Sequence, residues 1–570
     1  MRISMKKRVP VGIENFKEII EENYYYVDKT YLIKDILDKG GKNNLFTRPR
    51  RFGKTLNMSM LRYFFEKPID GVSNKALFDG LHIASAGERY VAEQEKYPVI
   101  SMTLKSAKQP NFEMAYESLV DEIVNEFQRH SYVYDSGVLN KEMQGKFERL
   151  MLREANNTEY ARALEFLSVC LCQYHQKPVI ILIDEYDVPL ENSYFAGFYD
   201  EMIAFIRSLF ESALKTNDNL YFAVITGCLR ISKESIFTGL NNLRVNSITT
   251  AEFSEYYGFE ENEVFDMLEY YDRTEKKDTM KQWYNGYLFG KTEVYNPWSV
   301  INYMRDLLAD EDAFPLANWA NTSSNSIVRD LIYNASEDVR EEIQELVDGN
   351  TIEKQIHEDI TYGDIDSSED NLWNFLFFTG YLKAESIRFD VDERYATLTI
   401  PNIEVKSIYK NQIRNWFRDE IKAKDLSNLH EALVGGDAEK LQEEIEPLLM
   451  NTISYMDNAE SFYQGFLLGI LANVKGYHIK SNREAGNGRY DIAVRSNNIK
   501  KRPVVIELKV AKKFREMEAA AETALQQIID RQYPIAFAED GYQEVICYGI
   551  GFFRKQLRVT METVNIEKYI

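Results

Sequence analysis

The chain has 570 residues, 45% of them hydrophobic and 13% aromatic, which suffices for about three or four packed domains and excludes an intrinsically disordered protein. Its net charge of −22 argues against a protein whose whole surface coats nucleic acid. No apolar run is long enough to span a bilayer, and the basic start lacks the apolar segment of a secretory signal. The four cysteines lack zinc or disulfide spacing. We therefore expect a cytoplasmic protein without membrane contact.

The charge is unevenly distributed along the chain. Residues Asn451–Ile570 carry a net charge of +3, whereas the first 450 residues carry −25. Between Arg483 and Arg515 there are ten Lys or Arg residues and three Asp or Glu residues. This asymmetry is expected when one domain meets a polyanion and the others do not.

The first predicted elements are a helix from about Asp28 to Leu37 and a phosphate-binding loop at Leu45–Thr55. A short apolar run leads into a polar loop, and Gly53-Lys54-Thr55 then opens a helix. In such a loop, backbone N–H groups and the positive helix end hold phosphates. Lys54 would pair with the terminal phosphates, and the Thr55 hydroxyl would ligate Mg²⁺.

One position departs from the common pattern of these loops. Arg48 stands five residues before Gly53, where the pattern has glycine, and Pro49 removes an amide donor. A non-glycine residue costs about 1–2 kcal/mol where the loop needs a positive φ. Because Gly-Lys-Thr is a common tripeptide, the loop alone also fits a cationic turn that starts a core helix.

A parallel α/β sheet is predicted from the elements that follow. Five consecutive apolar residues end in Asp184-Glu185, and a strand buried on both faces is typical of parallel sheets. Ligands of open α/β sheets bind at the carboxyl ends of such strands. The predicted elements are a strand at Pro98–Leu104, helices at Phe112–Phe127 and Glu159–His175, and strands at Val179–Ile183 and Leu220–Thr226.

Polar residues at these strand ends suit nucleotide chemistry. Asp184 is placed to supply the Walker-B carboxylate to Mg²⁺, and Glu185 to position or polarise an attacking water. Thr226 would sense the γ-phosphate, and Arg230 would stabilise transferred charge. A solvated strand end and a surface arginine remain the alternatives.

Between Ala251 and Gly435 no catalytic spacing emerges, and we expect a helical lid with a connecting region. Asn-Gly and Asn-Pro turns at Tyr284–Tyr287 and Tyr295–Trp298 are flanked by aromatic residues that fill small helical cores. Thr397–Ile400 is predicted as a short strand, and Asp364–Asp370 as an acidic linker.

The C-terminal part is predicted to begin with a helix at Glu460, followed by two strands that form a hairpin. The second strand, Val504–Val510, projects Glu507 and Lys509 to the same face because side chains alternate along a strand. Asp491, at the start of the preceding strand, could reach that face.

These residue types suit phosphodiester cleavage. Two carboxylates, Asp491 and Glu507, can hold Mg²⁺, and the Lys509 side chain can orient a water as an ammonium or deprotonate it as a neutral amine. Glu460 is either an additional metal ligand or an acidic residue at a helix N-terminus, where the helix dipole favours negative charge. The alternative is an ordinary ion pair on an exposed strand, but charged residues in so apolar a run are costly unless paired or ligating.

The motifs together resemble those of bacterial AAA-ATPase-like proteins that join an N-terminal P-loop ATPase to a C-terminal PD-(D/E)XK nuclease-like domain. The resemblance covers nearly the whole chain. It rests on Tyr26–Thr30, Arg48–Thr55, Leu182–Asp187, Ile236–Asn242, Trp283–Tyr287, Tyr295–Ser299, Ile400–Val405, Gly488–Asp491, Glu507–Lys509 and Ala524–Ile528.

This resemblance implies ATP as the nucleotide and makes Arg48 and Arg51 normal parts of the ATP-binding loop. It implies Asp491, Glu507 and Lys509 as the nuclease core, with Gln527 as an accessory. The implied fold is an α/β P-loop NTPase with a parallel sheet and helices on both faces, a helical lid and connecting region, and an α/β restriction-endonuclease-like domain. We expect these domains at residues 1–250, 251–435 and 436–570.

Two functional hypotheses follow. The first is an ATP- and Mg²⁺-dependent nuclease in which nucleotide binding gates a C-terminal site acting on nucleic acid, with DNA as the first choice. The second is a regulatory or signalling ATPase whose nuclease-like domain only binds a partner. A protein partner or a homo-oligomer is compatible with either hypothesis.

Overall fold

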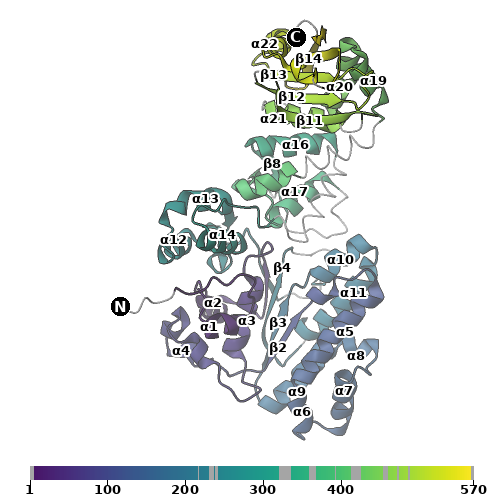
Figure 1. The fold of residues 1–570 in the computed structure, drawn as a ribbon. Helices are drawn as coiled ribbons and strands as arrows, with labels where there is room; N and C mark the ends of the chain where they lie inside the picture. Colours follow the sequence, from purple (N-terminus) through teal and green to yellow (C-terminus); the bar gives the residue numbers. More distant parts are fainter. Residues whose placement is uncertain are drawn as a thin grey trace. The chain divides into compact units, whose positions relative to one another are not determined.

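The computed structural model describes residues 6–215, 217–229, 236–237, 242–319, 336–357, 368–391, 393–411, 425–452, 460–471, 474–485, 488–538 and 540–566. The chain divides into two compact units. The first unit comprises Met1–Ala335 and Glu345–Tyr409, and the second comprises Ser336–Gln344 and Lys410–Ile570. Each unit has a central five-stranded sheet (Figure 1).

The central sheet of the first unit is entirely parallel, in the order β2-β3-β4-β1-β5, as the α/β prediction requires. Every residue of β3 is buried, in keeping with its apolar sequence. Parallel pairing brings the carboxyl ends of β1, β3 and β4 to one edge of the sheet. The strands are β1 (Asn43–Thr47), β2 (Val99–Thr103), β3 (Val179–Asp184), β4 (Leu220–Gly227) and β5 (Leu243–Asn246).

Helices cover both faces of this sheet, with α1–α4 on one side and α5, α10 and α11 on the other (Figure 1). The single helix expected at Glu159–His175 is two helices, because Arg162 leaves helical geometry (φ −116°). The bounds are α1 (Phe16–Glu21), α2 (Tyr31–Lys39), α3 (Lys54–Phe65), α4 (Glu88–Val91), α5 (Phe112–Arg129), α6 (Ser131–Asp135), α7 (Lys141–Met151), α8 (Asn157–Ala161), α9 (Ala163–His175), α10 (Val188–Ala196) and α11 (Tyr199–Phe210).

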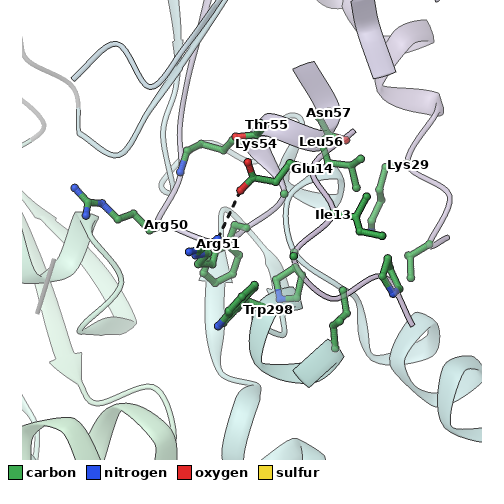
Figure 2. A pocket seen from close by; sticks show the side chains of 18 of the residues that line it. Ile13, Glu14, Lys29, Arg50, Arg51, Lys54, Thr55, Leu56, Asn57 and Trp298 are labelled. Atoms are coloured by element: carbon green, nitrogen blue, oxygen red, sulfur yellow. Dashed lines mark ion pairs between the residues drawn. The ribbon is translucent and has the colours of Figure 1, made fainter. Parts of the chain in front are cut away.

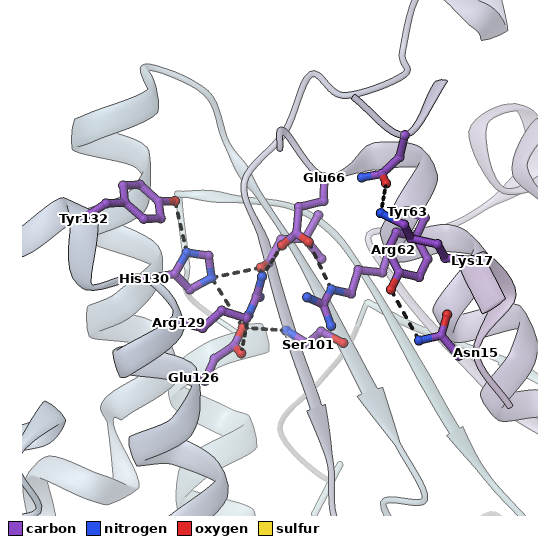
Figure 3. Close-up of polar contacts among 12 residues, drawn as sticks. Asn15, Lys17, Arg62, Tyr63, Glu66, Ser101, Glu126, Arg129, His130 and Tyr132 are labelled. Carbon is purple, nitrogen blue, oxygen red and sulfur yellow. Dashed lines mark hydrogen bonds and ion pairs between the residues drawn. The ribbon is translucent and has the colours of Figure 1, made fainter. Parts of the chain in front are cut away.

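Charged side chains of α5 cover the edge strand β2 (Figure 3). Glu126 Oε1 accepts the N–H of Ser101 at 2.8 Å, and Arg129 Nη2 donates to the C=O of Val99 at 2.6 Å. Glu126 and Arg129 also pair with each other, at 2.8 Å between Oε2 and Nε. These side chains take the place of a further strand for two backbone groups of the edge, the C=O of Val99 and the N–H of Ser101.

Glu126→Gln is expected to lower the free energy of unfolding by about 3 kcal/mol at pH 7, because it removes one of the two carboxylate partners of Arg129, whose side chain is only 19% exposed. Urea unfolding measures the change. Glu117→Gln on the same helix is the control: it removes an exposed ion pair with Arg153 and should cost at most about 1 kcal/mol. Equal losses in the two variants would contradict a structural role for the edge network.

The same region should make the protein sensitive to acid. Its ion pairs hold the pKa of Glu126 below the usual range, so the stabilisation is present above the unfolded-state pKa of about 4.3 and is lost as pH falls. Burial lowers the pKa of His175 from 6.5 to about 4, so stability also declines as pH falls through that interval, where only the unfolded state takes up the proton. Unfolding curves between pH 8 and pH 4 would show the decline due to His175, and curves continued below pH 4 would show the decline due to Glu126.

The rest of the first unit contains strands as well as the helices that were expected. Polar, largely exposed strands such as β9 lack the apolar run that signals a buried strand, so the sequence did not indicate them. They form the hairpin β6-β7 and the sheet β8-β10-β9. The elements are α12 (Glu261–Tyr270), α13 (Lys277–Tyr284), β6 (Tyr287–Phe289), β7 (Thr292–Val294), α14 (Pro297–Ala309), β8 (Ile352–Gln355), α17 (Glu369–Phe378), β9 (Lys383–Asp390) and β10 (Glu393–Thr399).

Two smaller predictions for this region had different outcomes. The short strand expected at Thr397–Ile400 is the end of the longer strand β10. Of the acidic stretch Asp364–Asp370, residues 364–367 lie outside the described residues, whereas Glu369 and Asp370 form the first turn of α17. The helix α16 (Glu337–Asp348) precedes this stretch.

The second unit has a mixed sheet in the order β11-β12-β13-β14-β15, in which β13 and β14 are parallel and the other pairs antiparallel. The predicted hairpin of β12 and β13 is confirmed. Apolar side chains of α19–α21 pack on one face of the sheet and those of α22 on the other. The elements are α19 (Ser427–Gly435), α20 (Ala438–Thr452), α21 (Glu460–Leu471), β11 (His478–Ala485), β12 (Gly488–Arg495), β13 (Val504–Val510), α22 (Met517–Asp530), β14 (Glu544–Phe553) and β15 (Gln556–Asn565). Within the described ranges, no helix combines the length and apolar character needed to cross a bilayer.

Candidate functional site

The loop between β1 and α3 turns through two residues with left-handed backbone, Arg51 (φ 69°) and Gly53 (φ 79°), and α3 begins at Lys54. Arg48 is not left-handed, and its N–H donates to the C=O of Gly227 at 3.1 Å, extending the pairing of β1 with β4. The strain expected at Arg48 is therefore absent. Arg51 is instead the non-glycine residue of this loop that has a positive φ and bears the cost of that conformation.

The side chain of Lys54 is buried beneath this loop. Its ammonium donates to the C=O groups of Arg48 and Pro49, each at 2.8 Å. Such charge-assisted bonds give the loop its curvature and keep a cation at its centre. Lys54 therefore lies where a phosphate held by the loop would meet it.

The Thr55 hydroxyl donates to Asp184 Oδ2 at 2.7 Å, and the Thr226 hydroxyl donates to Asp184 Oδ1. Three elements that are distant in sequence, α3, β3 and β4, thus meet at one buried carboxylate. A hydroxyl and a carboxylate are the hard oxygen donors that Mg²⁺ prefers, so Thr55 and Asp184 fit that ion. The position of Thr226 supports a role in holding Asp184.

Glu185 follows Asp184 with a left-handed backbone (φ 53°), which turns its side chain toward the cavity that Lys54 and Thr55 also line. Burial raises the pKa of Glu185, and the nearby charge of Asp184 raises it further, whereas Lys54 acts in the opposite direction. A carboxyl group with a raised pKa, close to a phosphate-binding lysine, is suited to accept a hydrogen bond or a proton from water.

Asp187, which the sequence did not single out, organises the segment after β4. Its buried carboxylate accepts the N–H groups of Cys228 (2.7 Å) and Leu229 (3.1 Å). Burial raises the pKa of Asp187, and the charge of Glu191 raises it further. Arg230 follows directly and lies outside the described residues, so its predicted role stays a prediction.

Arg48 does not line the cavity. Its guanidinium is fully buried, donates from Nη1 to the C=O of Asn246 at 2.6 Å, and lies 5.2 Å from the ring centroids of Tyr257 and Phe289. Burial lowers the pKa of Arg48 to about 10. This position favours a role in joining the loop to the core over direct contact with a nucleotide.

The other two arginines of the loop face different partners. Arg50 pairs with Glu191 of α10 at 2.6 Å. Arg51 stacks on the ring of Trp298, 4.3 Å from its centroid, and Glu14 lies 3.6 Å from its guanidinium. In Figure 2, Arg50 extends away from the group formed by Arg51, Glu14 and Trp298. Arg51 is thus a cavity-lining cation that an incoming anion can reach.

A cavity of about 290 Å³ opens beside the loop (Figure 2). Its lining combines cations with aromatic and apolar side chains, so the cavity matches a ligand with a charged part and a flat or apolar part. Its cations are Lys29, Arg50, Arg51, Lys54, Lys105 and Lys108, its acids are Glu14, Glu185 and Asp187, and its apolar residues include Ile13, Tyr25, Tyr26, Phe259, Met267 and Trp298.

A buried carboxyl group from the predicted lid and connecting region is linked to the loop through a tryptophan. Glu404 Oε1 accepts the backbone N–H of Trp319 (2.8 Å) and the hydroxyl of Ser299 (2.9 Å), and the indole N–H of Trp319 donates to the C=O of Arg50 at 3.3 Å. Burial raises the pKa of Glu404 to about 7. The signal in the sequence was a glutamate between the apolar residues Ile403 and Val405, whose partners are set only by the fold.

The second group of predicted residues meets on the face of the C-terminal sheet that α22 covers. Glu507 is buried, with Lys509 Nζ at 3.7 Å from its Oε1, and Gln527 of α22 donates to that same oxygen. Glu507 Oε2 accepts the N–H of Asp491 at 3.3 Å. The structure thus brings together Asp491, Glu507, Lys509 and Gln527.

Asp491 lies where β12 separates from β13. The pairing of these strands ends at Ile492 with Ile506, and beyond that point Asp491 Oδ2 accepts the N–H of Leu508 at 3.0 Å. The Asp491 carboxylate thus takes the place of a backbone C=O as the acceptor for Leu508. This bond holds the carboxylate toward the face of the sheet that carries Glu507. From α21, Gln464 donates to the C=O of Asp491 at 3.0 Å and fixes the bend.

Two glycines that sequence reasoning missed allow α22 to lie close to the sheet. A Cβ on Gly549 of β14 would be 2.2 Å from the C=O of Ala521, and one on Gly551 would be 2.2 Å from that of Met517. Both distances are too short for any side chain. This close approach lets Gln527 reach Glu507, and the Gly-x-Gly of β14 was the available signal.

Two carboxylates and a lysine form the described part of this site. Asp491 and Glu507 supply hard oxygen donors on one face, which fits a magnesium-type ion. Among the described residues, no cluster of three or more metal-ligating side chains occurs. Glu460 begins α21, but its side chain lies outside the described residues, so its metal role stays a prediction.

Comparisons with known proteins match the two parts of the chain that contain these sites. Residues 10–237 match a family described as "Predicted AAA-ATPase", and residues 458–562 match the PD-(D/E)XK nuclease superfamily. The chain is also 24% identical over 559 residues to an uncharacterized protein in the vnfD 5′ region of Azotobacter chroococcum mcd 1, which covers 96% of this chain and 97% of that protein. Both stretches include the predicted site residues of their domain, Arg230 among them.

Proposed function

Because the chain joins a predicted AAA-ATPase domain to a PD-(D/E)XK nuclease superfamily domain, we propose that it binds and hydrolyses ATP and cleaves nucleic acid in a Mg²⁺-dependent reaction. DNA is the first choice of substrate. We keep the division at residues 1–250, 251–435 and 436–570 and a cytoplasmic location as part of this proposal. Assembly of several copies is compatible with it.

The bond between Thr55 and Asp184 carries the ATP-binding half of the proposal. It joins the start of a helix to the end of a neighbouring parallel strand, beside a buried lysine and a cationic cavity. Lys54 is placed to exchange its two loop carbonyls for phosphate oxygens. The aromatic and apolar lining residues, Tyr25 among them, would receive the base.

Hydrolysis is proposed from Glu185. Its carboxyl group lines the cavity next to Lys54, and its raised pKa favours water positioning near the terminal phosphate. Mg²⁺ held by Thr55 and Asp184 would neutralise charge on the phosphates. Thr226 keeps Asp184 oriented through its hydroxyl.

The contacts around Glu507 support the nuclease half. Asp491 and Glu507 would hold a divalent ion that stabilises charge on the scissile phosphate. Lys509, 3.7 Å from Glu507, is placed to donate to that phosphate or to orient water. Gln527 holds the Glu507 carboxylate in the orientation that faces Asp491.

The alternative is a regulatory ATPase whose C-terminal domain only binds a partner. One observation favours it: the described site has two carboxylates, and each of them accepts a backbone N–H. A domain that has lost cleavage would keep these bonds for stability. Under this alternative, ATP binding persists and no nucleic acid is cut.

The deciding experiment uses the full chain. ATP binding is measured by calorimetry with Mg²⁺, and cleavage of labelled single- and double-stranded DNA and RNA is measured with Mg²⁺ or Mn²⁺, with and without ATP. We expect ATP binding, and cleavage that is lost in Lys509→Ala. Equal cleavage by Lys509→Ala would indicate a contaminating nuclease. ATP binding without any cleavage would favour the regulatory alternative, and absence of both activities would overturn both proposals.

A further inference from the structure

A basic edge lies directly beyond the Glu507–Lys509 strand. β13 and β14 are parallel, with Lys509 opposite Gly551 and Val510 opposite Phe552, so both strands end at the same side of the sheet. Two segments continue from there, the loop Lys512–Arg515 and the turn Arg554–Lys555. We name Lys512, Lys513, Arg515, Arg554 and Lys555 the basic edge.

Most charges of the basic edge are available to a ligand. Lys512, Lys513, Arg515 and Arg554 are exposed, and within the described part of the chain none of these four takes part in an ion pair. By contrast, Arg495 of the same unit is paired with Asp540 at 2.6 Å. On a chain with a net charge of −22, such a local group of cations favours contact with a polyanion.

An exposed aromatic ring lies among these cations. Phe514 is 53% exposed, and its ring centroid is 6.4 Å from that of Phe553 in an edge-on arrangement. The guanidinium of Arg554 lies 5.3 Å from the ring centroid of Phe553. Lysine and arginine attract the phosphates of any nucleic acid. An exposed aromatic ring, by contrast, can stack only on a base that is not already stacked within a duplex.

We propose that Phe514 and the basic edge form a binding surface for single-stranded nucleic acid, or for an unpaired end, which leads the strand to Asp491, Glu507 and Lys509. Phe514 stacks on a base while the cations pair with the phosphates on either side. Only two residues separate Lys509 from Lys512, so a nucleic-acid strand bound on this surface would continue to the carboxylates of Asp491 and Glu507. The inference deepens the proposed nuclease function and names its substrate class.

Binding is tested separately from cleavage. Fluorescence anisotropy with EDTA present compares a labelled single strand of about 20 nucleotides with a blunt duplex of the same length. For Phe514→Ala we expect a roughly 10-fold loss of affinity for the single strand and less than about a 2-fold loss for the duplex. Phe389→Ala, which removes a 71% exposed ring from the first unit, is the matched control and should change neither affinity.

A triple variant tests the cations. The combined variant Lys512→Ala, Lys513→Ala and Arg515→Ala should bind both probes more weakly. The slope of log affinity against log salt concentration should fall by the equivalent of about 2–3 phosphate contacts. Unfolding curves check that each variant is folded, as expected for exposed positions. Equal affinity of the wild type for both probes, or an unchanged affinity in Phe514→Ala, would overturn the inference.

The outcomes separate this inference from the proposed function. Loss of single-strand binding in Phe514→Ala, in a protein that cuts nothing, would support the surface and contradict the nuclease. Cleavage that Phe514→Ala leaves unchanged, together with unchanged binding, would support the nuclease and contradict the surface. A wild-type protein that binds neither probe overturns the surface.

Discussion

Lys54→Ala is expected to raise the dissociation constant for ATP by about 100-fold or more, because the charge-assisted bonds of this ammonium are among the strongest single contacts a phosphate can receive. The side chain is only 6% exposed and already bonds two carbonyl groups of the loop, at Arg48 and Pro49. Its removal therefore takes away the ligand for the phosphates and the support of the loop. Calorimetric titration with ATP and Mg²⁺ measures the loss.

The control for this prediction is Lys42→Ala. Lys42 is an exposed lysine directly before β1, outside the cavity, and its replacement should leave ATP affinity unchanged. Thermal unfolding without nucleotide reports whether either variant loses its fold. Thr55→Ala provides a second variant, which should reduce the dependence of binding on Mg²⁺. Unchanged ATP affinity in a folded Lys54→Ala protein would show that the loop is only a cationic turn.

Glu507→Gln is expected to lower the rate of cleavage by about 100- to 1,000-fold, since it removes one of two negative charges that hold the ion. Glutamine has nearly the same shape and can still accept the N–H of Asp491, so the sheet should keep its geometry. Cleavage of a labelled strand over a range of Mn²⁺ concentrations measures the effect.

Binding of nucleic acid without metal should be retained in Glu507→Gln, which separates a catalytic loss from a structural one. The matched control is Glu544→Gln, at the exposed start of β14 in the same unit, and its rate should equal that of the wild type. Asp491→Asn should behave like Glu507→Gln. If Glu507→Gln cuts at the wild-type rate while Lys509→Ala does not, the assignment of the metal ligands is wrong.

Local patterns were sufficient for a large part of both sites. Gly53-Lys54-Thr55 marks the start of a helix after a strand, and Asp184 ends a run of apolar residues that only a doubly covered strand accommodates. The alternation of side chains on β13 put Glu507 and Lys509 on one face. In each case the signal lies within about ten residues, because helix and strand periodicity are properties of the local backbone.

What the sequence by itself determined is thus the order of the elements, the α/β class and the residues able to carry the chemistry. Only the tertiary structure decided which of these residues meet. It buried Arg48 against Tyr257, put the left-handed turn at Arg51, and joined Glu404 to the loop through Trp319. These contacts link residues far apart in the chain, and such partners are selected by strand order and close packing, which no local period encodes.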